Sequence, residues 1–161
     1  MSDGRLERIW KKRVHGGPMD PVESARVETD LGIVDDANYG AGRQITIISG
    51  DAWDRVIDAM GADVDPSARR ANLMVRGIAL PGTRGRILEV GSCRILVQGE
   101  TRPCHIMDEA RQGLREALSP EWRGGVYGKV LAGGVIRVGD PVRWAPAETV
   151  SEPPAGTGGG R

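Results

Sequence analysis

Short apolar runs separated by glycine, proline and polar turn residues recur along the chain, a pattern typical of a protein built mainly from β-strands. The run 44–48 carries the strongest strand signal, because its isoleucines are β-branched and alternate with polar residues. The pattern predicts further strands over 6–10, 24–29, the end of 69–75, 86–90, 93–98, 126–131 and 135–138. Short glycine turns at 91–92 and 132–134 predict that the last four of these strands form two hairpins.

Two segments carry helical rather than strand periodicity. Trp53, Val56, Ile57 and Met60 form one apolar stripe at the spacing of an α-helix, and Gly61 is well placed to end that helix. Residues 107–118 have a similar stripe and predict a second helix. The strands do not alternate regularly with helices, so we expect a mainly β fold: a closed or partly closed antiparallel β-barrel with two or three short helices.

The 161 residues suit one domain, which we place at 1–146. Residues 147–161 are rich in proline and glycine and almost free of apolar side chains, which predicts a flexible tail. No apolar run is long enough to cross a bilayer, and the first residues lack the pattern of a signal peptide. We therefore expect a cytoplasmic protein that does not bind membranes.

Charge narrows the possible partners. The chain has 22 basic and 22 acidic residues, and this balance argues against a nucleic-acid binder, which needs a basic surface. Nearly all the basic residues are arginine, whose planar fork binds phosphate and carboxylate well. The chain has no P-loop, no G-x-S-x-G and no H-E-x-x-H, so nucleotide-dependent and common hydrolytic chemistry has little local support.

Cys104 is the strongest candidate for chemistry. It lies in Glu100-Thr101-Arg102-Pro103-Cys104-His105, between the end of an expected strand and the start of an expected helix. The helix N-terminus, Arg102 and His105 would all favour the thiolate, which can act as a nucleophile, carry a persulfide or bind a soft metal. A free cysteine can also be a buried apolar residue, and that is our interpretation of Cys93, which opens an apolar strand.

Two polar groups could serve such a thiol. Arg69, Arg70 and Asn72 lie between a proline turn and a strand, and Arg43 with Gln44 precedes the strongest strand. Each group could bind an anion, and each could equally be a solvated turn. The sequence alone does not show whether they converge on Cys104.

In order and spacing, the motifs of the chain resemble those of the MOSC family, named after the C-terminal domain of molybdenum-cofactor sulfurases. The resemblance runs from about Leu6 to Trp144. It rests on 43–47, on 68–73 followed by Val75-x-Gly77, on 85–91, on Thr101-Arg102-Pro103-Cys104, and on 134–142.

The resemblance implies a β-barrel with one critical cysteine and the molybdenum cofactor (molybdopterin) as ligand. By the same resemblance, Cys104 would carry sulfur as a persulfide or bind the metal. The cofactor-binding candidates are Arg43, Gln44, Arg69, Arg70, Asn72 and Arg102. Many members carry a Gly-Asp-x-x-His element where this chain has 32–38 without a histidine, so no role is carried over to that loop.

Several functions remain open at this point. The leading hypothesis is a protein that binds the molybdenum cofactor or transfers its sulfur through Cys104. It would have a cysteine desulfurase or a molybdoenzyme as partner, since no desulfurase domain is recognisable. One alternative is a small molybdenum-pterin reductase of N-hydroxylated compounds, with Cys104 as metal ligand. Others are a non-catalytic cofactor carrier and a barrel whose Cys104 is unreactive.

Overall fold

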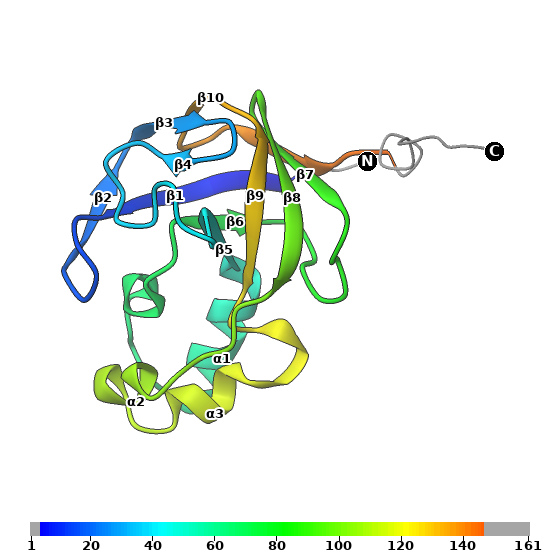
Figure 1. Cartoon of the computed structure of the whole chain (residues 1–161). Helices are drawn as coiled ribbons and strands as arrows, with labels where there is room; N and C mark the ends of the chain where they lie inside the picture. The colour runs from blue at the N-terminus through cyan, green and yellow to red at the C-terminus, as the bar shows by residue number, and fades with distance from the viewer. Residues whose placement is uncertain (1–3, 147–161) are drawn as a thin grey trace.

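The computed structural model describes residues 4–146 (Figure 1). The expected tail at 147–161 lies outside the described residues. The strands are β1 (Gly4–Lys12), β2 (Met19–Val22), β3 (Ser24–Glu28), β4 (Gly32–Ile33), β5 (Ile45–Ser49), β6 (Leu73–Arg76), β7 (Ile87–Val90), β8 (Cys93–Glu100), β9 (Val126–Ala132), β10 (Gly134–Arg137) and β11 (Pro141–Trp144). The helices are α1 (Gly50–Met60), α2 (Ile106–Ala110) and α3 (Leu114–Leu118), with short 3-10 helices η1 (Pro66–Arg69) and η2 (Pro120–Trp122).

The expected barrel is confirmed. Seven strands pair in the order β11-β7-β8-β9-β5-β6-β1, and pairing of β1 with β11 closes the ring. The pairs are antiparallel apart from β5 and β6, which are parallel because α1 carries the chain back across the end of the barrel between them. Alternate residues such as Ile95 and Val97 on β8 point inward and form the main core.

The hairpin expected over 86–98 is present, with Val90 opposite Cys93. The prediction of a second hairpin, over 126–138, is wrong. β10 pairs with β3 instead of β9, and with β4 it completes a separate three-stranded sheet (Figure 1). The physical reason is visible at Gly133, where a Cβ would lie 2.2 Å from the carbonyl oxygen of Val27. The chain therefore passes close against β3 as it leaves β9, and it continues along β3.

The first helix agrees with its sequence pattern. The side chain of Ser49 accepts a hydrogen bond from the backbone N–H of Ala52, and Gly61 ends the helix in the left-handed conformation. Trp53 and Val56 are buried in a second, smaller core, which they share with Met107, Leu114 and Leu118.

The single helix expected over 107–118 is instead divided into α2 and α3. Gly113 takes a φ of +90°, and the carboxylate of Asp108 accepts hydrogen bonds from the backbone N–H groups of Gly113 and Arg115. These bonds satisfy donors that α3 leaves free at its start, so α3 begins afresh after the break. Both helices still place apolar residues in the smaller core.

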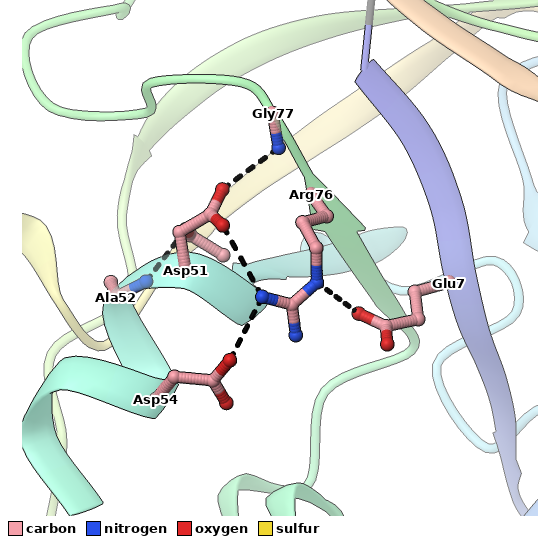
Figure 2. Close-up of polar contacts among 7 residues, drawn as sticks. Glu7, Asp51, Ala52, Asp54, Arg76 and Gly77 are labelled. Carbon is pink, nitrogen blue, oxygen red and sulfur yellow. Dashed lines mark hydrogen bonds and ion pairs between the residues drawn. The ribbon is translucent and has the colours of Figure 1, made fainter. Parts of the chain in front are cut away.

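One arginine connects the barrel to α1. The guanidinium of Arg76, on β6, lies 2.7 Å from Glu7 on β1, 3.2 Å from Asp51 and 2.8 Å from Asp54 on α1 (Figure 2). The other carboxylate oxygen of Asp51 accepts a hydrogen bond from the backbone N–H of Gly77. The hydrogen bond that Arg76 donates to Glu7 is the main cause that raises the pKa of Arg76. Arg76 thus fixes the orientation of α1 against the barrel wall.

Candidate functional site

Cys104 lies in the segment that joins the lower end of β8 to α2 (Figure 1). Thr101 and Pro103 in this segment are buried, whereas Cys104 is exposed. The carbonyl oxygen of Cys104 accepts a hydrogen bond from Met107, which starts the turn into α2. Because α2 has only five residues, its dipole gives the thiol much less support than the long helix expected from the sequence.

Arg69 holds the start of the Cys104 segment in place. Its Nε donates to the carbonyl oxygen of Gly124 at 2.8 Å, and its Nη2 donates to that of Thr101 at 3.0 Å. The hydroxyl of Thr101 also donates to Gly124, at 2.9 Å. Arg69 therefore links η1, the end of β8 and the glycine pair that precedes β9.

Arg70 points in a different direction from Arg69. It takes a left-handed φ of +64°, and its Nη2 donates to the carbonyl oxygen of Gly17, in the loop between β1 and β2, at 2.7 Å. Non-glycine residues in this conformation are uncommon, and they occur often at functional sites. Because of this turn, the guanidiniums of Arg69 and Arg70 bond to different backbone segments, at Thr101 and at Gly17 respectively.

Lys12 is a further cation in this region. Burial lowers the pKa of Lys12, Asp36 opposes this shift, and the charges of Arg70 and Arg69 lower it further. Burial also lowers the pKa of Arg69, a Cys104 thiolate opposes that shift, and Arg43 adds to it. Lys12, Arg43, Arg69 and Arg70 thus form one group of interacting cations, hereafter the basic cluster, and Arg69 is the member that interacts with Cys104.

The guanidinium of Arg43 lies over an aromatic ring. Its guanidinium carbon is 4.6 Å from the ring centre of Tyr127, on β9. Tyr127 in turn packs against Gly99, where a Cβ would lie 3.1 Å from the ring. The stack of Gly99, Tyr127 and Arg43 provides a flat surface with a positive charge on it.

The amides of Gln44 and Asn72 are used inside the protein. Gln44 donates to the carbonyl oxygen of Asp30 and accepts from the backbone N–H of Val130. Asn72 is buried and bonds to Thr46, Trp10 and Asp36. Both amides therefore brace the walls around the basic cluster.

Arg102 lies apart from this arrangement. Its side chain is 86% exposed and is 3.8 Å from the carboxylate of Glu100. With Glu100 and Arg115 it lines a cleft of about 430 Å³ that does not include Cys104. The sequence placed Arg102 next to the thiol because the two residues are close along the chain, but the side chain turns toward Glu100.

The sequence interpretation missed Lys12 and Tyr127 as site residues. Lys12 lies on β1 and Tyr127 on β9. Strand pairing, and not proximity in sequence, brings these strands to the site. The one available signal was rarity, since the chain has three lysines and two tyrosines.

Size alone does not locate the site. Clefts of about 910 Å³ and 600 Å³ lie around α1, and neither Cys104 nor the arginines of the basic cluster line them. Within residues 4–146 no group of three or more His, Cys, Asp or Glu side chains is arranged to hold a metal ion. No helix in the same part of the chain is long and apolar enough to cross a membrane.

The two cysteines differ sharply, which gives a simple prediction. Cys93 is fully buried, and burial raises its pKa to about 11, whereas Cys104 is exposed. We expect Ellman's reagent at about pH 8 to label one thiol in the folded protein and both in denaturant, because the reagent needs an accessible thiolate. Cys104→Ser should leave no fast-reacting thiol in the folded protein. Rapid labelling that persists in this variant would contradict the assignment.

A sequence profile of the MOSC domain matches residues 11–143, which is most of the chain. The chain belongs to the MOSC family. The match covers nearly the same stretch as the motifs quoted above, and it includes both Cys104 and the arginines of the basic cluster. The family is associated with the molybdenum cofactor. No curated protein matches the chain significantly in sequence.

Solved structures share the fold. The YuaD protein from Bacillus subtilis matches with a TM-score of 0.75 at 20% identity, over 88% of this chain and 94% of that one. YiiM from Geobacillus stearothermophilus matches with a TM-score of 0.68 at 18% identity, over 89% and 75% of the two chains. YiiM from Escherichia coli matches with a TM-score of 0.63 at 17% identity, over 88% and 70%. At these identities the likeness establishes the barrel and its helices.

Proposed function

We propose that this MOSC protein binds the molybdenum cofactor at the basic cluster and carries sulfur on Cys104 as a persulfide for transfer to an acceptor. The observation that carries the proposal is an exposed thiol on the segment that Arg69 anchors, where Arg69 interacts with the other cations of the basic cluster. These cations come from three parts of the chain: β1, the segment before β5, and the end of η1. The carboxylate of Asp36 offsets part of their mutual repulsion at Lys12, and a bound anion would offset more.

The side chains fit the chemical parts of the cofactor. A pterin phosphate is an anion, and Arg70 and Lys12 offer positive charge within the basic cluster. The pterin ring is flat, and the guanidinium of Arg43 on Tyr127 offers a flat cationic surface. Molybdenum accepts soft thiolate ligands, and Cys104 is the exposed thiolate source of the region. When bound, the cofactor would supply a redox-active metal and a site for the transferred sulfur.

The sulfur-transfer step needs little from the protein beyond a positioned thiolate. The Cys104 thiolate attacks the terminal sulfur of a persulfide on a donor such as a cysteine desulfurase. A new S–S bond forms on Cys104 as the donor's S–S bond breaks, and the donor leaves as its own thiolate. No net oxidation occurs, because the sulfane sulfur only changes partner. The surrounding cations stabilise the negative charge both before and after transfer.

The test compares wild type with Cys104→Ser, using Cys93→Ser as the matched control. Each protein is purified from a molybdate-supplied host and assayed for pterin and molybdenum. Each is then incubated with a cysteine desulfurase and cysteine, and the added sulfur is located by mass spectrometry. We expect pterin in all three proteins and persulfide on Cys104 in wild type and Cys93→Ser alone.

The other outcomes decide between functions. If Cys104→Ser keeps pterin but loses molybdenum, and wild type never accepts sulfur, Cys104 is a metal ligand and the reductase function replaces sulfur transfer. If cofactor binding is unchanged in Cys104→Ser and no protein accepts sulfur, the chain is a carrier. If wild type holds neither pterin nor persulfide, the proposal is wrong.

A further inference from the structure

Two arginines compete for the role of partner to Cys104. Arg102 is two residues away in sequence, but its side chain is 86% exposed and faces Glu100. A highly exposed guanidinium beside a carboxylate is screened by water and by its partner, so its field at a nearby sulfur is weak. Arg69 is 35 residues away in sequence, yet it bonds to the segment that carries the thiol.

Arg69 belongs to a compact group of hydrogen bonds. Its guanidinium binds the carbonyl oxygens of Thr101 and Gly124, and the backbone N–H of Thr101 donates to Gly125 at 2.9 Å. These bonds fix the position of the residue three places before Cys104. Arginine suits this task because its rigid fork can satisfy two carbonyl groups at once.

These contacts leave no room for a side chain at Gly124. A Cβ there would lie 2.5 Å from the Thr101 oxygen, 3.0 Å from Cδ of Pro103 and 3.3 Å from Nη2 of Arg69. Pro103 is buried against this backbone, and its ring limits the rotation of the chain immediately before Cys104. The backbone path that leads to Cys104 is thus set by contacts that begin at Arg69.

The charge of Arg69 also interacts with a thiolate at Cys104. Burial lowers the pKa of Arg69, and a Cys104 thiolate is the first cause that opposes the shift. A guanidinium removed from water interacts more strongly with a nearby anion than an exposed one does, because less solvent screens it.

We infer that Arg69 is the positioning residue of Cys104: it anchors the 101–104 segment through two backbone carbonyls and places a half-buried positive charge beside the thiol, a task that Arg102 does not perform. The inference rests on the proposed function only in taking Cys104 as the working group. An Arg69 that only contacted a phosphate, or that only belonged to a solvated turn, would not have this role.

The test measures the local charge at Cys104 with two alkylating reagents of similar size. Iodoacetate is an anion and iodoacetamide is neutral. The rate of alkylation by iodoacetate divided by that by iodoacetamide, at one fixed pH, therefore reports the electrostatic potential at the sulfur. Arg69→Gln is expected to lower this ratio roughly three- to tenfold, the effect of one charge removed at several ångströms. Arg102→Gln is the matched control and should change the ratio by less than about twofold.

Arg69→Lys separates charge from anchoring. Lysine keeps the positive charge, so the ratio should stay near that of wild type, but its single ammonium cannot hold two carbonyls in the same way. Hydrogen exchange over residues 101–105 should therefore be faster in Arg69→Lys than in wild type. This variant also carries the test if Arg69→Gln does not fold, as judged by near-ultraviolet circular dichroism.

Three results would overturn the inference. They are an unchanged ratio in folded Arg69→Gln, a loss in Arg102→Gln as large as in Arg69→Gln, and unchanged exchange over 101–105 in Arg69→Lys. Alkylation needs neither pterin nor a sulfur donor. A protein that shows the Arg69 effects but takes up no cofactor or sulfur would therefore refute the proposed function alone.

Discussion

Replacing Asn72 by alanine is expected to lower the free energy of unfolding by roughly 3 kcal/mol, because it leaves several buried polar groups without partners. Asn72 is 1% exposed. Its side-chain oxygen accepts from the backbone N–H and the hydroxyl of Thr46, and its Nδ2 donates to the Trp10 carbonyl and the Asp36 carboxylate. The bond to Asp36 is charge-assisted and contributes most per bond.

Urea unfolding followed by circular dichroism measures this effect, with Asn38→Ala as control. Asn38 reaches the same carboxylate, but through its backbone N–H at 2.9 Å, which alanine keeps. The control should change the free energy of unfolding by less than about 0.5 kcal/mol. Equal losses in the two variants would show that the buried amide of Asn72 has no special weight.

The role of Asn72 also shows where the sequence was informative. The Arg-Arg-Ala-Asn segment stood out as a candidate binding element, and in the structure Arg69 bonds to the backbone of the Cys104 segment while Arg70 bonds to Gly17. What the sequence could not show is the direction of each side chain. Burial of Asn72 depends on Trp10, Asp36 and Thr46, which lie far from it along the chain.

The same distinction explains the fold. Elements set by local rules were predicted well: the stripe of α1 and its end at Gly61, and the Gly91-Ser92 turn between β7 and β8. The errors came from contacts that are distant in sequence. β10 looked like the second arm of a hairpin until its pairing with β3 was known, and residues 107–118 looked continuous until Asp108 was seen to cap α3.

Cysteine placement shows how far a local pattern can go. Cys93 lies on the same inward face of β8 as Ile95 and Val97 and is buried, whereas Cys104 follows a buried proline in a polar turn and is exposed. Both outcomes follow from the strand period and from the turn. The contacts of the nearby arginines do not follow from these local patterns, since Arg102, two residues from Cys104, faces Glu100, whereas Arg69 bonds to the backbone of the Cys104 segment.

Gly125→Ala is expected to destabilise the protein by roughly 3 kcal/mol through two separate causes. Gly125 has a φ of +104°, which side chains rarely adopt, and a Cβ there would lie 2.3 Å from the carbonyl oxygen of Ile47. Relief of that contact requires β9 and β5 to move apart where they pair, at Ile47 and Val126. The carbonyl of Gly125 also accepts from Thr101, so the Cys104 segment should exchange hydrogen faster in this variant.

Gly139→Ala separates the two causes. Gly139 has nearly the same φ, +100°, but a Cβ there would have nothing within 4 Å. Its loss should therefore reflect backbone strain alone, about 1 kcal/mol, with no change in the Cys104 segment. The difference between the two variants in urea unfolding measures the close approach of β9 to β5. If the two losses are equal, strain accounts for the whole effect, and Gly125 is not required for the packing of β9 against β5 beside the Cys104 segment.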